Sequence, residues 1–182
     1  MKRVLLIVGS LRKNSFHGQL ALEIKKLLEG RANVQVLEYA DVPFLNQDIE
    51  FPAPAAVAKV RQAAQEADGI WILSPEYNYQ IPGVLKNLLD WLSRPLIPND
   101  SQRVSAVTGK TVTISSAAGS SAGAGVRKHL RALLEIMSMS VVGGEGTGIV
   151  LDGEAWGTNV LTLSDENRAA LNAQADQLLA KL

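Results

Sequence analysis

The segment Val4-Leu-Leu-Ile-Val8, followed directly by Gly9-Ser-Leu-Arg-Lys-Asn-Ser15, decides the fold. Five consecutive aliphatic residues that stop at a glycine are typical of a strand buried on both faces, as strands of parallel sheets are. The polar turn leads into a segment with apolar residues at helical spacing, for which Ser15 or Asn14 is a suitable N-cap. A buried strand, a polar turn and a capped helix predict the first unit of an α/β fold.

The same alternation of strand and helix continues along the chain. Further aliphatic runs occur at residues 34–37, 69–73 and 112–114, and weaker ones at 141–142 and 149–151. Apolar residues at helical spacing occupy segments 20–28, 57–67, 126–137 and 171–182. This pattern predicts one domain over residues 1–182. We expect an α/β three-layer sandwich in which helices cover both faces of a parallel sheet of about five strands, in the order 2-1-3-4-5.

Composition excludes several classes of function. Lys and Arg number 18, Asp and Glu also 18, so the formal net charge is +0 and no overall charge favours nucleic acid or an anionic membrane. The chain has no cysteine, which excludes disulfides, thiolate nucleophiles and Cys-ligated metals. It has only 2 histidines, which argues against a histidine metal cluster. Redox chemistry would then fall to a bound cofactor. No stretch approaches the ~20 apolar residues of a membrane span. We expect a cytoplasmic protein without a metal site.

The turn after the first predicted strand is a candidate anion site. Ser10, Asn14 and Ser15 supply short polar groups, and Arg12 and Lys13 supply positive charge. Backbone N–H groups and the positive end of the helix dipole converge at such a position. The turn lacks the glycine patterns of a P-loop and of dinucleotide-binding folds, which disfavours an NTPase and a Rossmann dehydrogenase. These residue types favour a phosphate monoester such as that of FMN, although an ordinary polar turn would look much the same.

A second loop, Ser74-Pro-Glu-Tyr-Asn-Tyr-Gln-Ile-Pro-Gly83, follows the third predicted strand. In a sheet of order 2-1-3-4-5 the first and third strands are neighbours, so this loop and the anion turn border one crevice. Its amides and the pair Tyr77 and Tyr79 suit the polar edge and flat face of an isoalloxazine, but loop aromatics often only pack. A third loop, Ser115 to Gly125, is rich in Gly and Ser and follows the fourth strand at the same edge.

A wide apolar stripe marks the helical segment after the second loop. Projected at 100° per residue, the apolar residues of segment 81–93 fall within an arc of roughly 160°. Such a stripe can cover more than its own sheet. It predicts either a homodimer contact through this helix or burial beneath the proline-rich loop at 94–98.

Together the three loops resemble one family, the NADPH-dependent FMN reductases of flavodoxin-like fold, which include quinone, azo-dye and chromate reductases. The resemblance rests on residues 9–16, on Ser74-Pro-Glu-Tyr-Asn-Tyr79, on Ile81-Pro-Gly-Val-Leu-Lys-Asn87 with Asp90-Trp91, and more weakly on Ser115, Ser116 and Gly119. It covers most of residues 1–142. Residues 143–163, which include Trp156, match no part of the family pattern.

The resemblance implies a flavodoxin-like fold, bound FMN, and NADPH or NADH as electron donor. It implies FMN contacts from Ser10, Arg12, Asn14, Ser15 and Phe16 around the phosphate, from Pro75, Glu76, Tyr77 and Asn78 along the isoalloxazine, and from Ser116 and Gly119 on its other side. Because FMN carries the chemistry, no catalytic side chain is expected, and Tyr77 is a candidate for shaping the acceptor pocket. His17 is interpreted as first-turn helix polarity and His129 as a surface or interface residue.

The predicted function is an NAD(P)H oxidoreductase that passes hydride through FMN to quinone, azo, flavin or metal-oxyanion acceptors by a ping-pong mechanism, as a homodimer or homotetramer. Two alternatives use the same crevice. A flavodoxin-like electron carrier usually needs an acidic docking surface, which a chain without net charge lacks. A non-enzymatic flavin-binding module would bind FMN without consuming NADPH.

Overall fold

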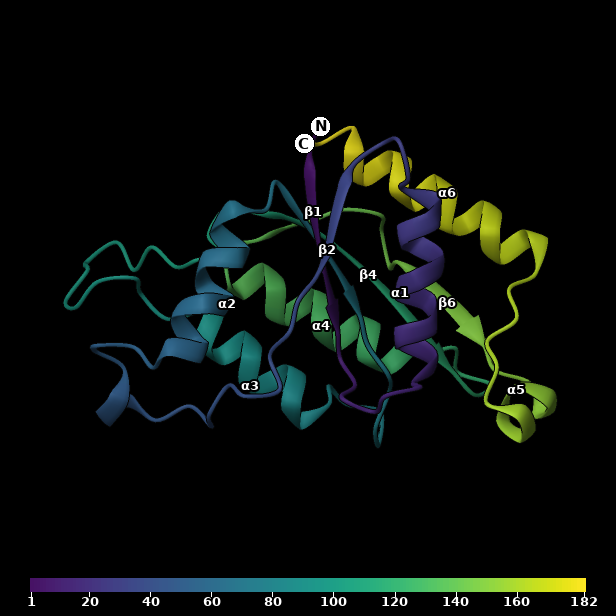
Figure 1. The fold of residues 1–182 in the computed structure, drawn as a ribbon, viewed down its shortest axis with the longest axis horizontal. Coiled ribbons are helices and arrows are strands. Elements are labelled where there is room, and N and C mark those ends of the chain that lie inside the picture. Colours follow the sequence, from purple (N-terminus) through teal and green to yellow (C-terminus); the bar gives the residue numbers. More distant parts are fainter.

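The computed structural model describes residues 1–182 and has one six-stranded sheet between two layers of helices (Figure 1). The elements are β1 (Arg3–Val8), α1 (Phe16–Leu27), β2 (Asn33–Val36), the 3-10 helix η1 (Gln47–Ile49), α2 (Ala55–Glu66), β3 (Gly69–Leu73), α3 (Gly83–Leu92), β4 (Thr111–Ala118), α4 (Ala124–Ile136), β5 (Ser140–Val141), β6 (Thr147–Val150), α5 (Gly153–Thr158) and α6 (Asp165–Leu179). All strand pairs are parallel. The order β2-β1-β3-β4-β5, with β6 beside β4, confirms the predicted topology.

The two faces of the sheet bury separate apolar cores. Leu5 and Ile7 of β1 belong to the core under α2, α3 and α4, whereas Val4 and Leu6 belong to the core under α1 and α6. Figure 1 shows these two groups of helices on opposite sides of the sheet. Because both faces are covered, every residue of β3 is buried, and its sequence is continuously apolar instead of alternating.

Two short strands share the fifth position of the sheet. β5 pairs with the start of β4 at Thr111 and Val112, and β6 pairs with its end, from Ser115 to Ala118. The segment between them leaves the sheet at glycines with positive φ: Gly143, Gly144 and Gly146. Both weak aliphatic runs therefore form strands, and the sheet has one strand more than the five we expected.

The apolar stripe of α3 is buried within the chain. Val84 at the start of the helix is 37% exposed, whereas the leucine and tryptophan side chains are at most 1% exposed: Leu85, Leu88, Leu89, Trp91 and Leu92. Trp91 Nε1 donates to Pro43 O at 2.8 Å, and the Arg61 guanidinium of α2 lies 5.8 Å from the Trp91 ring centroid. Leu96, from the proline-rich loop, packs against the same core. Apart from Val84, the stripe is thus covered within one chain, so it supplies no argument for a dimer. No helix is both long and apolar enough to cross a bilayer.

Candidate functional site

The three loops predicted to share one edge of the sheet meet there. A Cβ on Gly9 would lie 3.2 Å from Pro75 Cδ and from Ser74 Cα, so the first turn and the second loop are in close contact. A cavity of about 220 Å³ opens at this edge. It is lined by Ser10, Arg12, Ser15, Phe16, His17, Pro75, Glu76, Tyr77, Ala117, Ala118, Gly119, Leu151 and Trp156. Most of the predicted site residues are among them.

Three predicted residues do not line this cavity: Asn14, Asn78 and Ser116. Asn14 belongs to the exposed turn, and its backbone oxygen accepts a hydrogen bond from Asn159 Nδ2. Asn78 lies in the exposed loop after β3. Ser116 is fully buried, and its Oγ donates to Ser74 O at 2.6 Å, so this hydroxyl supports the loop from behind.

The first turn of α1 presents free donors to the cavity. Ser15 is the N-cap, and its Oγ accepts from Gly18 N at 3.0 Å. The N–H groups of Phe16 and His17 have no acceptor within the chain. The single side-chain hydrogen bond of Arg12 goes to a neutral amide oxygen, so its charge is not compensated. Orphan N–H groups at a helix start, together with an uncompensated guanidinium, form an anion site.

The second loop ends in a tight hairpin that displays two aromatic rings. Tyr77 and Gln80 exchange backbone hydrogen bonds of 3.2 and 2.9 Å. Asn78 and Tyr79 between them have φ of 52° and 61°, as a two-residue turn with both central φ angles positive requires. Positive φ is unusual for a bulky residue such as Tyr79. Because Tyr77 and Tyr79 are 53% and 71% exposed, they are not packing residues within this chain.

Glu76 fixes the second loop to α4. Its carboxylate accepts from Ser121 Oγ and from Val126 N, each at 2.7 Å. Val126 lies in the first turn of α4, and the N-cap of that helix, Gly123, has no side chain to offer. Glu76 therefore caps α4 from a distant loop. The second and third loops are joined by this contact.

Both histidines have contacts that the sequence analysis missed. His129 Nδ1 lies 3.0 Å from Tyr79 O, so it donates its proton to the hairpin. His17 is 3% exposed, and its Nε2 accepts from Ala117 N at 3.0 Å, which places the proton of the neutral ring on Nδ1. Burial lowers the pKa of His17 to about 4, although a hydrogen bond with the Ser74 backbone opposes this in part. The interpretation of His17 as first-turn helix polarity is therefore wrong, because the ring is buried against β4.

A further wall of the cavity comes from segment 143–163, which matches no part of the family pattern. α5 places Trp156 at the cavity, where its ring meets that of Phe16 edge-on, with centroids 5.4 Å apart and planes at 85°. Asn159, directly after α5, accepts from Arg12 Nη1 and donates to Asn14 O. No motif indicated these two residues, because only the fold brings them to the first turn.

The donor set fits FMN. The phosphate would meet free N–H groups and Arg12 at one end of the cavity. At the other end, nothing lies within 4 Å of a Cβ built on Gly119, and its φ is not positive. Neither packing nor backbone conformation requires a glycine there, so the space beside Gly119 is open to a flat ligand. Because about 220 Å³ is below the ~300–1,000 Å³ of most enclosed ligand pockets, a flavin would extend along the exposed Tyr77 hairpin.

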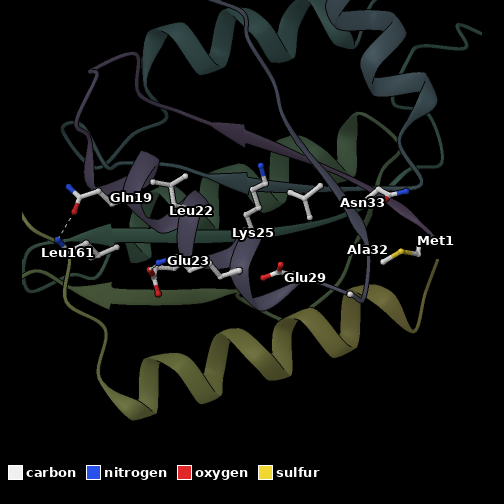
Figure 2. Close-up of a pocket in the computed structure, with 12 residues that line it drawn as sticks. Met1, Gln19, Leu22, Glu23, Lys25, Glu29, Ala32, Asn33 and Leu161 are labelled. Carbon is white, nitrogen blue, oxygen red and sulfur yellow. Dashed lines mark hydrogen bonds and ion pairs between the residues drawn. The ribbon is translucent and has the colours of Figure 1, made fainter.

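A larger depression of about 630 Å³ runs along α1, between Gln19 and the N-terminal ends of β1 and β2 (Figure 2). It contains no loop that follows the carboxyl end of a strand, where open α/β sheets bind ligands. Two of its charged groups are engaged in surface ion pairs, because Glu23 bonds to Lys26 at 2.8 Å and to Arg168 at 2.9 Å. We therefore place the functional site at the smaller cavity.

Comparison with known proteins gives consistent matches. The family model for NADPH-dependent FMN reductase matches residues 2–150. The quinone reductase of Escherichia coli strain K12 is 38% identical over 144 residues, which cover 77% of this chain and 73% of that relative. The flavoenzyme NAD(P)H:(acceptor) oxidoreductase FerB from Paracoccus denitrificans superposes with a TM-score of 0.85 at 26% identity, over 99% of this chain and 96% of its own.

A flavodoxin from the domain Archaea shares the fold, with a TM-score of 0.59 and 14% identity over 98% of this chain and 97% of its own. These matches confirm both the resemblance carried by the three loops and the flavodoxin-like architecture. Oxidoreductase activity, FMN as cofactor and NAD(P)H as electron donor are properties of the matched family. The chain belongs to the NADPH-dependent FMN reductase family.

Proposed function

We propose that the chain, as one domain over residues 1–182, is an NAD(P)H oxidoreductase with quinone, azo, flavin or metal-oxyanion acceptors and a ping-pong mechanism. The observation that carries the proposal is the convergence of an anion-binding turn and an aromatic hairpin on one cavity, in a member of this family. Bound FMN supplies hydride acceptance and release, so the protein binds and orients the reactants. The dependence on NAD(P)H supports a cytoplasmic location.

In this proposal Ser10, Arg12 and Ser15 hold the FMN phosphate, with Asn14 and Phe16 nearby. Arg12 supplies charge, and the free N–H of Phe16 supplies a donor at the positive end of α1. Ser15 Oγ already accepts the capping hydrogen bond, but its own proton remains available to the ligand. The turn therefore offers both charge and directed donors to a dianionic group.

The loop Pro75–Asn78 lines one side of the isoalloxazine and Gly119 the other. Glu76 is committed to α4, so its part is to hold the loop in shape. Ser116 acts one step away, because its buried hydroxyl bonds the Ser74 carbonyl. Tyr77, half exposed at the rim of the cavity, is placed to contact the electron acceptor.

The test measures oxidation of NADH and NADPH by the flavin-loaded protein as the loss of nicotinamide absorbance. Benzoquinone, an azo dye and chromate serve as acceptors. We expect steady consumption with at least the quinone, and parallel lines in double-reciprocal plots, as a ping-pong mechanism requires. FMN binding without nicotinamide oxidation would identify an electron carrier or a binding module instead. A protein that binds no FMN would refute the proposal.

Arg12→Ala and Lys13→Ala form a matched pair for the site. Both remove a positive charge from the same exposed turn, but only Arg12 lines the cavity. We expect Arg12→Ala to weaken FMN binding at equilibrium with the fold intact, and Lys13→Ala to weaken it much less. Equal effects would show that the turn attracts FMN only through its overall positive charge and not through a specific contact of Arg12.

We also propose that the chain assembles as a homodimer or homotetramer, through the loops 40–54 and 94–105. Figure 1 shows both loops projecting beyond α2 and α3 on the same side of the molecule. Each loop exposes a large apolar side chain, Phe44 at 85% and Ile97 at 61%, which supports a contact surface at these loops. Arg94 bonds both oxygens of the Glu50 carboxylate at 2.8 and 2.9 Å and so joins the loops. Light scattering that reports a monomer at micromolar concentration would refute assembly.

A further inference from the structure

The segment 151–161 lies just beyond the stretch that the family model matches, yet it forms one wall of the candidate FMN site. Leu151 N donates to Ala118 O at 2.7 Å, which extends the contact between β6 and β4 to the edge of the cavity. Trp156 then packs against Phe16 at the start of α1. The sheet edge that positions the three loops therefore also positions this wall.

Asn159 joins the wall to the anion turn through both ends of its side chain. Its Oδ1 accepts from Arg12 Nη1 at 2.9 Å, and its Nδ2 donates to Asn14 O at 3.0 Å. Because a guanidinium only donates and a carbonyl only accepts, these partners fix the orientation of the amide. The residue has φ of 58°, which asparagine tolerates, and its backbone oxygen accepts from Gln19 Nε2 at 2.9 Å.

The side-chain amide of Gln19, on α1, likewise bonds the wall through both of its ends. Its Oε1 accepts from Leu161 N at 2.8 Å while its Nε2 bonds Asn159 O. The side-chain amides of Asn159 and Gln19 thus make four hydrogen bonds, which join residues 12–19 to the segment that leads from α5 to α6. Asn159 is held from its backbone as well as from its side chain.

This bridge orients Arg12 without neutralising it. The guanidinium lies 5.7 Å from the Phe16 ring centroid and pairs with no carboxylate. Only its Nη1 is engaged, so Nε and Nη2 keep their protons for a bidentate contact with a phosphate. An exposed arginine loses considerable side-chain entropy when a ligand orders it. A neutral acceptor that orders Arg12 in advance lowers this loss and leaves the full charge to the ligand.

We propose that Asn159 is the positioning residue for the phosphate of FMN, and that it acts by presenting Arg12 from the wall 151–161. The inference rests on the proposed function, since it takes FMN as the ligand. FMN and riboflavin differ by the phosphate alone. The preference of the chain for FMN over riboflavin therefore depends on Asn159.

The test compares FMN and riboflavin binding by equilibrium fluorescence titration of the full chain freed of flavin. Asn159→Gly removes the side chain without straining a backbone of positive φ. Asn99→Gly is the matched control, because Asn99 also has φ of 58° but lies in the remote loop 94–105. We expect Asn159→Gly to lower the ratio of FMN to riboflavin affinity about tenfold, the scale of one hydrogen bond to a charged group. Asn99→Gly should leave the ratio unchanged.

Asn159→Asp tests the charge argument separately. Aspartate keeps an acceptor for Arg12 and tolerates positive φ, but it neutralises the guanidinium and repels the phosphate. We expect a larger fall in the FMN to riboflavin ratio than for Asn159→Gly, and a fall that becomes smaller as salt is added. A ratio equal to that of the wild type would overturn the argument.

A double variant shows whether Asn159 acts through Arg12. In the Arg12→Ala background, Asn159→Gly is expected to leave the ratio unchanged. An equal loss with and without Arg12, or a parallel loss of both flavins at constant ratio, would overturn the inference, because Asn159 would then only support the wall. A wild type that binds FMN no better than riboflavin would also overturn it, whereas one that binds neither would overturn the proposed function as well.

Discussion

Acidification tests how His17 supports the floor of the site. The ring is 3% exposed and accepts a hydrogen bond from Ala117 N, so the folded chain holds it neutral. Burial lowers its pKa from the ordinary 6.5 to about 4. In the unfolded chain the same ring is free to titrate near its ordinary value. Between these two pKa values, the unfolded chain binds a proton that the folded chain does not.

The sign and size of the effect follow from this difference. Above pH 6.5 the ring is neutral in both states and pH has no influence through it. As the pH falls towards about 4, the unfolded state binds more protons, so the free energy of unfolding decreases. The gap between the two pKa values corresponds to about 3 kcal/mol, at about 1.4 kcal/mol per pH unit. Below about pH 4 both states are protonated and the loss is complete.

Urea unfolding of the wild type and of His17→Asn at about pH 7 and about pH 4.5 measures this loss. Asparagine can accept the Ala117 hydrogen bond but does not titrate. Carboxylates lose stabilising contacts with acid in both proteins, so only the difference between them belongs to His17. We expect the wild type to lose about 2–3 kcal/mol more than the variant. Equal losses in the wild type and in His17→Asn would refute the reasoning.

Three further substitutions test the contacts that shape the site. Glu76→Ala removes the cap of α4 and should cost about 2–3 kcal/mol in urea unfolding, with faster hydrogen exchange in the first turn of α4 than in Glu76→Gln. Gly146→Ala would place a Cβ 2.0 Å from a carbonyl oxygen of β4 and should lower Tm severely, whereas Gly144→Ala, with open space around it, should cost only about 1–2 kcal/mol for its positive φ. Gln174→Leu removes the Oε1 that accepts a 2.9 Å hydrogen bond from the buried Ser115 hydroxyl and should cost about 2–4 kcal/mol in urea unfolding.

The parts of the site that the sequence predicted are those whose chemistry is local. The turn Gly9–Ser15 carries its charge, its small residues and its helix cap within one short stretch, and Ser15 is the cap in the structure. The order of strands follows from buried runs and from the rules of parallel connections. Once strands one and three are neighbours, the meeting of their loops follows without any knowledge of side-chain contacts.

The residues that were missed reach the site through long-range contacts. Arg12 and Asn159 are 147 residues apart, and no local period connects them. His17 is different, because a signal for it was present: it precedes Leu20 by three residues and Ile24 by seven, and all three are buried. Helical spacing alone would have placed this histidine on the apolar face of α1 and predicted a buried ring.

The break between β5 and β6 allows the chain to reach the candidate site. Where the chain leaves the sheet, Thr113 and Ile114 of β4 pair with β3 on one side but have no strand beside them on the side of β5 and β6. Gln174 of α6 takes that place, since its Nε2 donates to Ile114 O and to Thr113 Oγ1, each at 2.7 Å. A helix side chain thus satisfies the carbonyl that a continuous strand would have paired. Because the gap is closed in this way, β6 can pair with the far end of β4 and deliver Trp156 and Asn159 to the anion turn.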